Sequence, residues 1–117
     1  MLVVTRYAVP PGEVVQFREQ CVAAIEALVA CPGCTGACAG PALDDPSLWV
    51  LSTSWESVGA YRRALSSYQV KVVAVPLMYR AIDEPSAFES LVAWTPDGGL
   101  RQTPSAIAAG GDDRGGG

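Results

Sequence analysis

Residues 44–65, DDPSLWVLSTSWESVGAYRRAL, contain a turn, a strand, a corner and the start of a helix in unbroken order. Residues 44–46 are turn formers. Residues 48–55 (LWVLSTSW) are apolar and rich in residue types that favour strands. Ser57 stands where a helix N-cap is expected. We therefore predict a strand over 48–55 and a helix from about Ser57, the middle of a β-α-β-β-α-β domain.

Upstream of this stretch, the sequence predicts a strand, a helix and a second strand. Residues 2–9 (LVVTRYAV) have β-branched and aromatic types, and Pro10 ends them. A helix is expected over about 13–30, before the breaker pair Pro32-Gly33. Residues 34–41 (CTGACAGP) are predicted as the second strand. Their small side chains pack poorly in a sheet, which suggests that something large lies against them, such as an aromatic ring, a ligand or a partner.

Downstream, a second helix is expected over 57–75, with apolar residues at steps of three and four. Ser66 and Ser67 interrupt the pattern and could bend or split the helix, and Pro76 should end it. Residues 77–83 (LMYRAID) are predicted as the fourth strand. Residues 86–94 are expected to form a short extension, either strand or helical turn.

The composition changes at Thr95, where a segment rich in Gly, Pro and Asp begins. Such a segment buries too little apolar surface to order itself. We therefore predict one folded domain over residues 1–94 and a disordered, low-complexity tail over residues 95–117. A length of 117 residues agrees with a single domain.

The order of elements predicts an α+β fold of the ferredoxin-like type, with an antiparallel four-stranded sheet and both helices on one face. The opposite face would be bare and apolar. Because hydrophobic residues make up 50% of the chain, we expect that face to pair with a second copy in a homodimer.

Charge and hydrophobic patterning exclude some classes of partner. The net charge is −4 with only 8 Lys and Arg, so nucleic acid is not an expected partner. No apolar run reaches the roughly 18–20 residues of a membrane span. The start, MLVVTRYAV, lacks the pattern of a secretion signal. A cytoplasmic location with reduced cysteines is therefore expected.

The chain has four Cys and no His. Cys31, Cys34 and Cys38 resemble a metal-binding pattern, but no second CxxC and no His completes a tetrahedral site. We interpret these three as small apolar residues beside a turn and expect no metal, while their role stays open, including a Cys31–Cys34 disulfide on oxidation. The absence of His also excludes triad hydrolases and a haem-degrading barrel with an axial His.

Aromatic and basic residues are the remaining candidates for a site. Trp55 and Tyr61 could stack on a flat ligand or simply pack in the core. Arg80, inside the predicted fourth strand, could stabilise an anion or make a salt bridge, as could Arg6. Further aromatic residues could line a pocket or be satisfied internally, and the basic residues of the second helix are interpreted as solvated: Tyr7, Tyr68 and Tyr79; Arg62, Arg63 and Lys71.

Residues 1 to about 92 resemble the antibiotic biosynthesis monooxygenase family of dimeric α+β barrels. The resemblance rests on VTRYAVPPGEVVQF (4–17), CPGC (31–34), DDPSLWVLSTSWES (44–57) and PLMYRAIDEP (76–85). It implies a substrate phenol or anthrone that, once deprotonated, reduces dioxygen without metal, flavin or haem. Trp55 and Tyr61 match a family Trp and Tyr six positions apart. The family Asn four positions before the Trp is Leu51 here, so one polar contact is missing.

These observations lead to the expectation of a cofactor-independent monooxygenase acting on an aromatic or polyketide-type small molecule in secondary metabolism. The alternatives are a cyclase or isomerase using the same pocket and a non-enzymatic binding or accessory protein. The expected catalytic residues are Trp55 for stacking, Tyr61 for hydrogen bonding to the phenol and Arg80 for charge stabilisation. The expected substrate-binding residues are Tyr7, Phe17, Leu51, Tyr68 and Tyr79.

Overall fold

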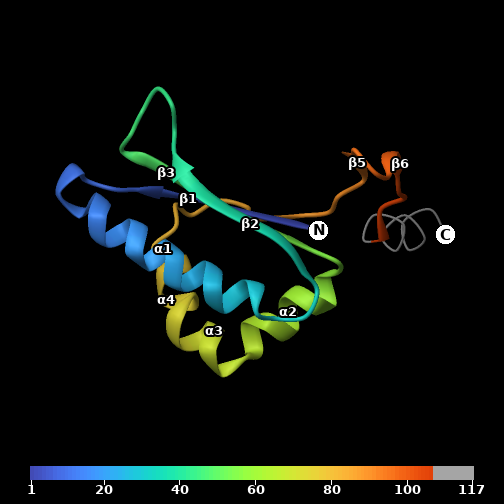
Figure 1. The fold of residues 1–117 in the computed structure, drawn as a ribbon, viewed down its shortest axis with the longest axis horizontal. Helices are drawn as coiled ribbons and strands as arrows, with labels where there is room; N and C mark the ends of the chain where they lie inside the picture. The colour runs from blue at the N-terminus through green and yellow to red at the C-terminus, as the bar shows by residue number, and fades with distance from the viewer. Residues whose placement is uncertain (107–117) are drawn as a thin grey trace. The chain divides into compact units, whose positions relative to one another are not determined.

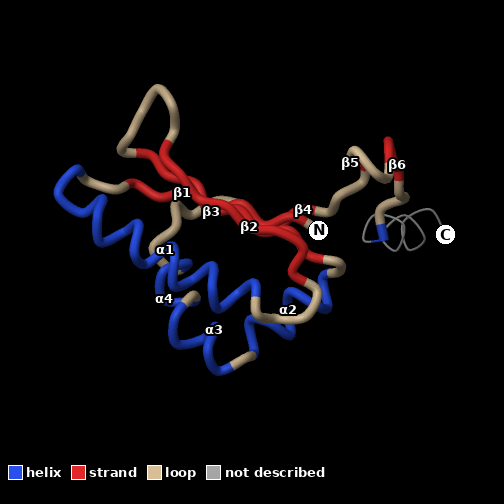
Figure 2. Tube along the Cα trace, in the orientation of Figure 1, coloured by secondary structure: helices blue, strands red, loops and turns tan. Residues whose placement is uncertain are grey.

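The computed structural model describes residues 1–106, and its main sheet has four strands in the order β2-β3-β1-β4. Figure 2 draws the strands in red and the helices in blue. Strand β3 (Leu48–Trp55) runs antiparallel to both β1 (Leu2–Ala8) and β2 (Cys34–Pro41). The strands expected over 34–41 and 48–55 have these bounds, and the first strand ends one residue earlier than expected. The α+β, ferredoxin-like fold class is confirmed.

One face of the sheet is buried because large side chains alternate along β1 and β3. Val3, Thr5 and Tyr7 of β1 share this face, as do four residues of β3: Trp49, Leu51, Thr53 and Trp55. The helices of the domain cover the same side of the sheet (Figure 1). Strand β2, built from Gly, Ala, Cys, Thr and a final Pro, has no buried residue. The core therefore lies under β1 and β3 rather than under the edge strand.

Helix α1 (Val14–Val29) follows a single 3-10 turn, η1 (Pro11–Glu13), so the helix expected over 13–30 is confirmed within one residue. Its buried face carries Phe17, Cys21 and Leu28 among others. Gly33 then turns the chain towards β2 with φ at +91°, and a Cβ there would lie 2.5 Å from the Cβ of Ala60. Only glycine fits this close approach of α1's exit to the second helical region.

The second helical region is divided into α2 (Val58–Ser66), α3 (Tyr68–Val73) and α4 (Val75–Met78). Ser57 caps α2 by accepting from Ala60 N at 3.1 Å, and Ser67 caps α3 by accepting from Val70 N at 3.4 Å. The split at Ser66 and Ser67 is confirmed. Within residues 1–106, no helix combines the length and the apolar character needed to cross a bilayer.

The fourth strand expected over 77–83 is wrong. Pro76 does not end a helix; it stands in the first turn of α4, where its missing N–H costs no hydrogen bond. Turn-type bonds continue to Ala81, whose N–H donates to Met78 O at 3.1 Å. The fourth strand is β4 (Ala87–Phe88), inside the region 86–94 for which a strand or a helical turn was expected. The breaker Pro76 and the apolar residues after it suggested a strand at 77–83, but local helical bonds continue past Pro76.

The chain divides into two compact units, Met1–Ala87 and a second one that begins at Phe88. The second unit contains a hairpin of β5 (Val92–Thr95) and β6 (Gly99–Gln102), whose turn uses Gly99 at φ +66°. Residues 95–102, expected to belong to a disordered tail, are thus part of this hairpin, because a positive-φ glycine lets two short strands pair. Residues 107–117 of the expected tail lie outside the described residues.

The uncovered face of the main sheet is only partly apolar. Leu2, Val4 and Ala8 of β1 alternate with the buried set, and Leu48 and Val50 of β3 do the same. Arg6 crosses this face and makes two bonds of 2.7 Å to the Glu84 carboxylate. This pair raises the pKa of Arg6 and lowers that of Glu84, mainly through the hydrogen bonds.

Candidate functional site

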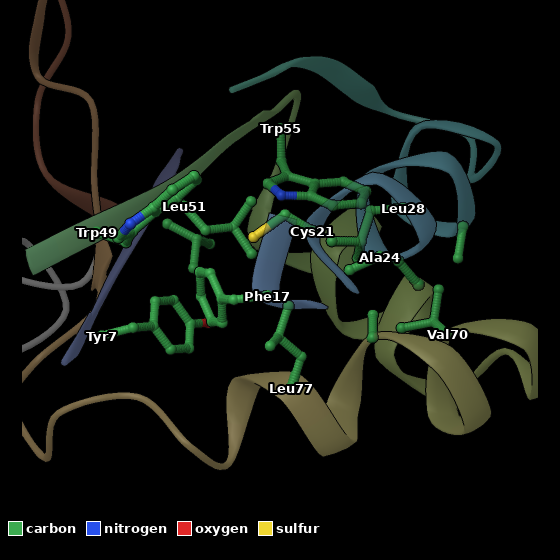
Figure 3. Packing of buried hydrophobic residues seen from close by; sticks show 14 of the residues in the cluster. Tyr7, Phe17, Cys21, Ala24, Leu28, Trp49, Leu51, Trp55, Val70 and Leu77 are labelled. Atoms are coloured by element: carbon green, nitrogen blue, oxygen red, sulfur yellow. The ribbon is translucent and has the colours of Figure 1, made fainter. Parts of the chain in front are cut away.

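An aromatic cluster fills the space between the sheet and α1. The ring centroids of Tyr7 and Phe17 are 5.1 Å apart, and Phe17 meets Trp49 edge-on at 5.4 Å. Figure 3 shows these side chains reaching the same interior from β1, α1 and β3. Tilted and edge-to-face contacts of this kind add to the burial of the rings. The cluster is a packed core, with Tyr7 and Phe17 each 1% exposed.

The hydroxyl of Tyr7 is held inside this core. It lies 2.9 Å from Thr5 Oγ1, and the Thr5 hydroxyl donates to Leu51 O at 3.3 Å. Burial raises the pKa of Tyr7, so the phenol stays protonated well into the alkaline range. Tyr7 is therefore a neutral group whose hydrogen bonds are satisfied within the protein. Thr5 also borders a groove at the surface, which brings this short network close to solvent.

The β3–α2 corner carries the second aromatic pair, Trp55 and Tyr61, with centroids 5.5 Å apart. Trp55 is 3% exposed and its Nε1–H donates to Thr53 Oγ1 at 2.8 Å. Tyr61 is half-buried, and burial raises its pKa. The Ser57 cap begins α2 directly after the strand, and this local order sets the two rings against each other.

Arg80 follows α4 and reaches back to α1. Its guanidinium donates to Gln20 Oε1 at 2.9 Å and lies 3.5 Å from Glu13 Oε1. Its Cζ also lies 5.7 Å from the centroid of the Phe17 ring, a cation–π contact. The charge of Arg80 is thus placed against the aromatic cluster, next to Tyr7, whose pKa it lowers slightly against the effect of burial.

An open groove lies along the broken second helical region. It has a volume of about 420 Å³ and is lined by Leu65, Lys71, Val75, Met78 and Tyr79; we call it the helix groove. Ligand sites of small molecules start at roughly 300 Å³ and are mostly apolar with a few polar groups, and this groove has that character. Leu65 lies one helical turn after Tyr61, on the same side of α2.

A second depression, of about 310 Å³, adjoins the helix groove because Met78 and Tyr79 line both. Its other lining residues include Thr5, Ile82 and Glu84. The two together lead from the neighbourhood of Tyr61 past Met78 and Tyr79 to the Thr5 hydroxyl. Their polar groups are an ammonium, a phenol, hydroxyls and carboxylates at the far end.

The residues expected to form one site lie in four places. Tyr7, Phe17 and Leu51 are in the core, with Arg80 at its border. Trp55 and Tyr61 form the corner pair. Tyr79 is 85% exposed and lines the helix groove, whereas Tyr68 is 79% exposed and belongs to neither groove described above.

Sequence reasoning missed Thr5, Trp49 and Lys71. Thr5 and Trp49 lie on the buried face of their strands, a position that strand alternation alone could have indicated. Lys71 was interpreted as solvated. It is exposed and lines the helix groove, because the break at Ser67 starts a new helix and changes which side of the chain it presents. The helical periodicity of an unbroken 57–75 helix could not show this.

The four cysteines are free and spread over the domain. Cys21 is buried. The Sγ atom of Cys31 lies 3.8 Å from Ser67 Oγ, and that of Cys38 lies 3.0 Å from Ser52 Oγ. Among the described residues, no three His, Cys, Asp or Glu side chains gather in a way that could hold a metal ion. The Cys-Pro-Gly-Cys segment lies at the chain reversal between α1 and β2, where Gly33 has φ at +91°.

Solved structures with the same fold come from several microbes. A conserved Methanosarcina mazei Go1 protein matches with a TM-score of 0.61 and 23% identity, over 74% of this chain and 84% of that chain. A candidate antibiotic biosynthesis monooxygenase from Nitrosomonas europaea matches with a TM-score of 0.60 and 15% identity, over 74% and 82%. Rv0793 of Mycobacterium tuberculosis matches with a TM-score of 0.58 and 20% identity, over 74% of this chain and 86% of that chain.

A search of curated proteins finds no significant match. The family model described as "Antibiotic biosynthesis monooxygenase" matches residues 1–74, well over half of the 117 residues. The matched range covers β1, α1, β2, β3, α2 and α3, and so includes the aromatic cluster, the corner pair and Lys71. The chain therefore belongs to the antibiotic biosynthesis monooxygenase family.

Proposed function

We propose that this protein binds a flat, electron-rich phenol or anthrone in the helix groove and oxygenates it with dioxygen, without a bound cofactor. The observation that carries the proposal is the composition of that groove. Three apolar side chains stand beside one ammonium group, Lys71, and one phenol, Tyr79. An apolar wall suits an aromatic ring, and a cation beside it suits the anion that such a ring forms on losing a proton.

The proposed chemistry asks little of the protein. An anthrone loses a proton, and its anion passes electrons to dioxygen. The methylene carbon is oxidised by four electrons to a carbonyl; one oxygen atom of O₂ becomes the carbonyl oxygen and the other leaves in water. The protein would stabilise the anion and hold the ring away from bulk solvent. The ammonium of Lys71 suits the first task, and the walls formed by Leu65 and Met78 suit the second.

The corner pair supports the groove in this proposal. Tyr61 lies one turn before Leu65, so its hydroxyl could donate to a substrate oxygen from the neighbouring side. The Trp55 ring packs against the Tyr61 ring, with centroids 5.5 Å apart, and the Trp55 N–H already donates to Thr53 Oγ1. We assign Trp55 to positioning rather than to stacking on substrate. Arg80 would act on the site at longer range, from the border of the aromatic cluster.

We also propose a homodimer formed through the uncovered sheet face, in a reducing compartment such as the cytoplasm. The apolar side chains Leu2, Val4 and Val50 on that face favour association. Four free thiols suit a reducing environment. Analytical ultracentrifugation should show twice the monomer mass, and Val50→Lys should shift the species towards the monomer.

The test is oxygen consumption with 1,8-dihydroxyanthrone as substrate. The protein should raise uptake several-fold above the uncatalysed rate, with the quinone as product. Lys71→Met should lower kcat/KM by about tenfold or more, since it removes the only cation of the groove lining. Arg62→Met, which removes an exposed charge outside that lining, is the matched control and should leave the rate unchanged.

Three other results would overturn this proposal. Conversion of a polyketide-like substrate under nitrogen would indicate a cyclase or isomerase. Tight binding of the anthrone without turnover would indicate a binding or accessory protein. Equal activity of Lys71→Met and Arg62→Met would exclude the helix groove as the reaction site.

A further inference from the structure

A separate groove lies between α1 and the edge strand β2. It has a volume of about 290 Å³, and we call it the edge groove. Helix α1 contributes four of its lining residues, β2 three and β3 one: Arg18, Cys21, Val22 and Ile25; Ala39, Gly40 and Pro41; and Trp49. The small side chains of β2 leave this space open. The sequence led us to expect that something large lies against this strand, and the edge groove is where a ligand could do so.

Trp49 brings an unused donor to this groove. The residue is 7% exposed, and its Nε1 is shielded from solvent with no hydrogen-bond partner in the part of the chain that the structure describes. Buried polar groups in native proteins are almost always paired, so an exception indicates strain, an unseen partner or a functional role. Figure 3 shows Trp49 near Leu51 at one end of the packed cluster, far along β3 from Trp55.

The charged group of the edge groove is also unpaired. Arg18 is exposed, and the ion pairs among the described residues join Arg6 to Glu84 and Arg80 to Glu13. No carboxylate of residues 1–106 lines the edge groove. Burial raises the pKa of Cys21, so its thiol stays neutral rather than adding a negative charge. Among the described residues, those of the groove therefore combine a cation without an ion-pair partner, a buried indole N–H without an acceptor and an apolar remainder.

We propose that the edge groove binds a small monocarboxylate with an apolar body. The Arg18 guanidinium would take the carboxylate, the Trp49 N–H would donate to one of its oxygens, and Val22, Ile25 and Ala39 would contact the apolar part. Because the indole nitrogen is buried, the acceptor reaches it only after lining side chains shift. This site shares no lining residue with the helix groove, so it does not depend on the proposed oxygenation.

The test is an NMR titration of ¹⁵N-labelled protein with cyclohexanecarboxylate. The saturated ring causes no ring-current shift, so movement of an indole N–H resonance reports a new hydrogen bond. The Trp49 indole signal is identified by its loss in Trp49→Phe, and the remaining two signals belong to Trp55 and Trp94. We expect the Trp49 signal to move downfield in a saturable manner, while those of Trp55 and Trp94 stay in place.

Matched variants and a neutral ligand decide the result. Arg18→Gln should weaken binding about tenfold, the loss expected for one charge-assisted contact, and Arg62→Gln should not weaken it. Ala39→Leu should fill the groove and abolish the shift; dispersed spectra of each variant confirm folding. Equal binding of cyclohexanecarboxamide, equal affinity of the two Arg variants, or an unmoved Trp49 signal would each overturn the proposal.

Discussion

Strand β3 carries a tryptophan at each end of its buried face, and the two differ in the hydrogen bonding of their indole N–H groups. Trp55 is 3% exposed and its N–H is bonded to Thr53, on the same strand two residues earlier. Trp49 is 7% exposed and its N–H has no partner among the described residues. The sequence drew attention to Trp55, through its six-residue spacing from Tyr61, and did not single out Trp49.

The difference follows from what lies opposite each indole. Near Trp55, the exit of α1 and the start of α2 close tightly, with Gly33 against Ala60. Near Trp49, the neighbouring β2 offers only Ala39, Gly40 and Pro41, and the edge groove remains. The two side chains are buried to a similar extent, so burial does not distinguish them. The hydrogen bonding of the indole N–H does.

The largest expected effect is on the free energy of unfolding, when a Cβ is added close to Trp55 or close to Trp49. Gly33→Ala places a Cβ 2.5 Å from Ala60 Cβ at a positive φ, so the free energy of unfolding should fall by about 2–4 kcal/mol. Gly40→Ala, at the Trp49 end, meets nothing within 4 Å and should leave stability unchanged or raise it by up to about 1 kcal/mol. Urea unfolding at one protein concentration measures both, and equal losses would contradict the comparison.

The next effect concerns the two N–H groups directly. Trp55→Phe and Trp49→Phe remove the same atoms from buried positions, but only the first breaks a hydrogen bond and leaves Thr53 Oγ1 without it. Trp55→Phe should therefore be the more destabilising by about 1–3 kcal/mol. Chemical denaturation checks the difference, and a larger loss for Trp49→Phe would mean that its N–H has a partner in solution.

A third prediction uses the phenol at each end. Burial raises the pKa of both Tyr7 and Tyr61 above that of an unfolded tyrosine. A raised folded pKa contributes stability that is complete below about pH 10 and is lost as the pH rises through the folded value, at up to about 1.4 kcal/mol per pH unit for each proton. Tyr7→Phe and Tyr61→Phe should each flatten this alkaline loss. Unfolding of the parent and of both variants, followed from pH 8 to 12, measures the difference, and an equal loss in all three would contradict the prediction.

The smallest effect concerns Arg80, which borders the aromatic cluster at the Trp49 end. Arg80→Gln removes the contact over Phe17 and should lower the unfolding free energy by about 0.5–1 kcal/mol, a modest amount because the side chain is half exposed. Arg62→Gln should stay within about 0.5 kcal/mol of the parent. A fall in oxygenation rate much larger than the stability loss would support a role for Arg80 in stabilising the anion.

The architecture was predictable where local signals agreed with each other. Caps, breakers and alternation placed the strands at 34–41 and 48–55, the helix near 13–30 and the split at Ser67. The fourth strand was misplaced because Pro76 was taken to end the helix and the apolar residues 77–83 were then assigned to a strand, while their backbone closes helical turns after Pro76. Two strands as short as β4 and β5 carry too few residues for a pattern to be decisive.

The candidate site was less predictable, because it depends on which side chains end up without partners. The six-residue spacing of the family Trp and Tyr identified Trp55 and Tyr61, and Tyr79 was a candidate as a phenol on a predicted strand. No pattern in the sequence could show that Trp49 finds no acceptor and Arg18 no carboxylate within residues 1–106, or that Lys71 lines a groove. These properties arise from long-range packing between α1, β2 and the broken second helical region.

The break at Ser67 has a consequence for motion. Helices of 9, 6 and 4 residues are each too short to be stable alone. Helix α1, with 16 residues, is slightly longer than the roughly 12–15 residues below which an isolated helix is marginal. The wall of the helix groove should thus open at a lower free energy than the sheet, and its amides should exchange with deuterium first. Entry of a ligand and departure of a product would then proceed by brief fraying of α3 and α4 rather than through a permanent channel.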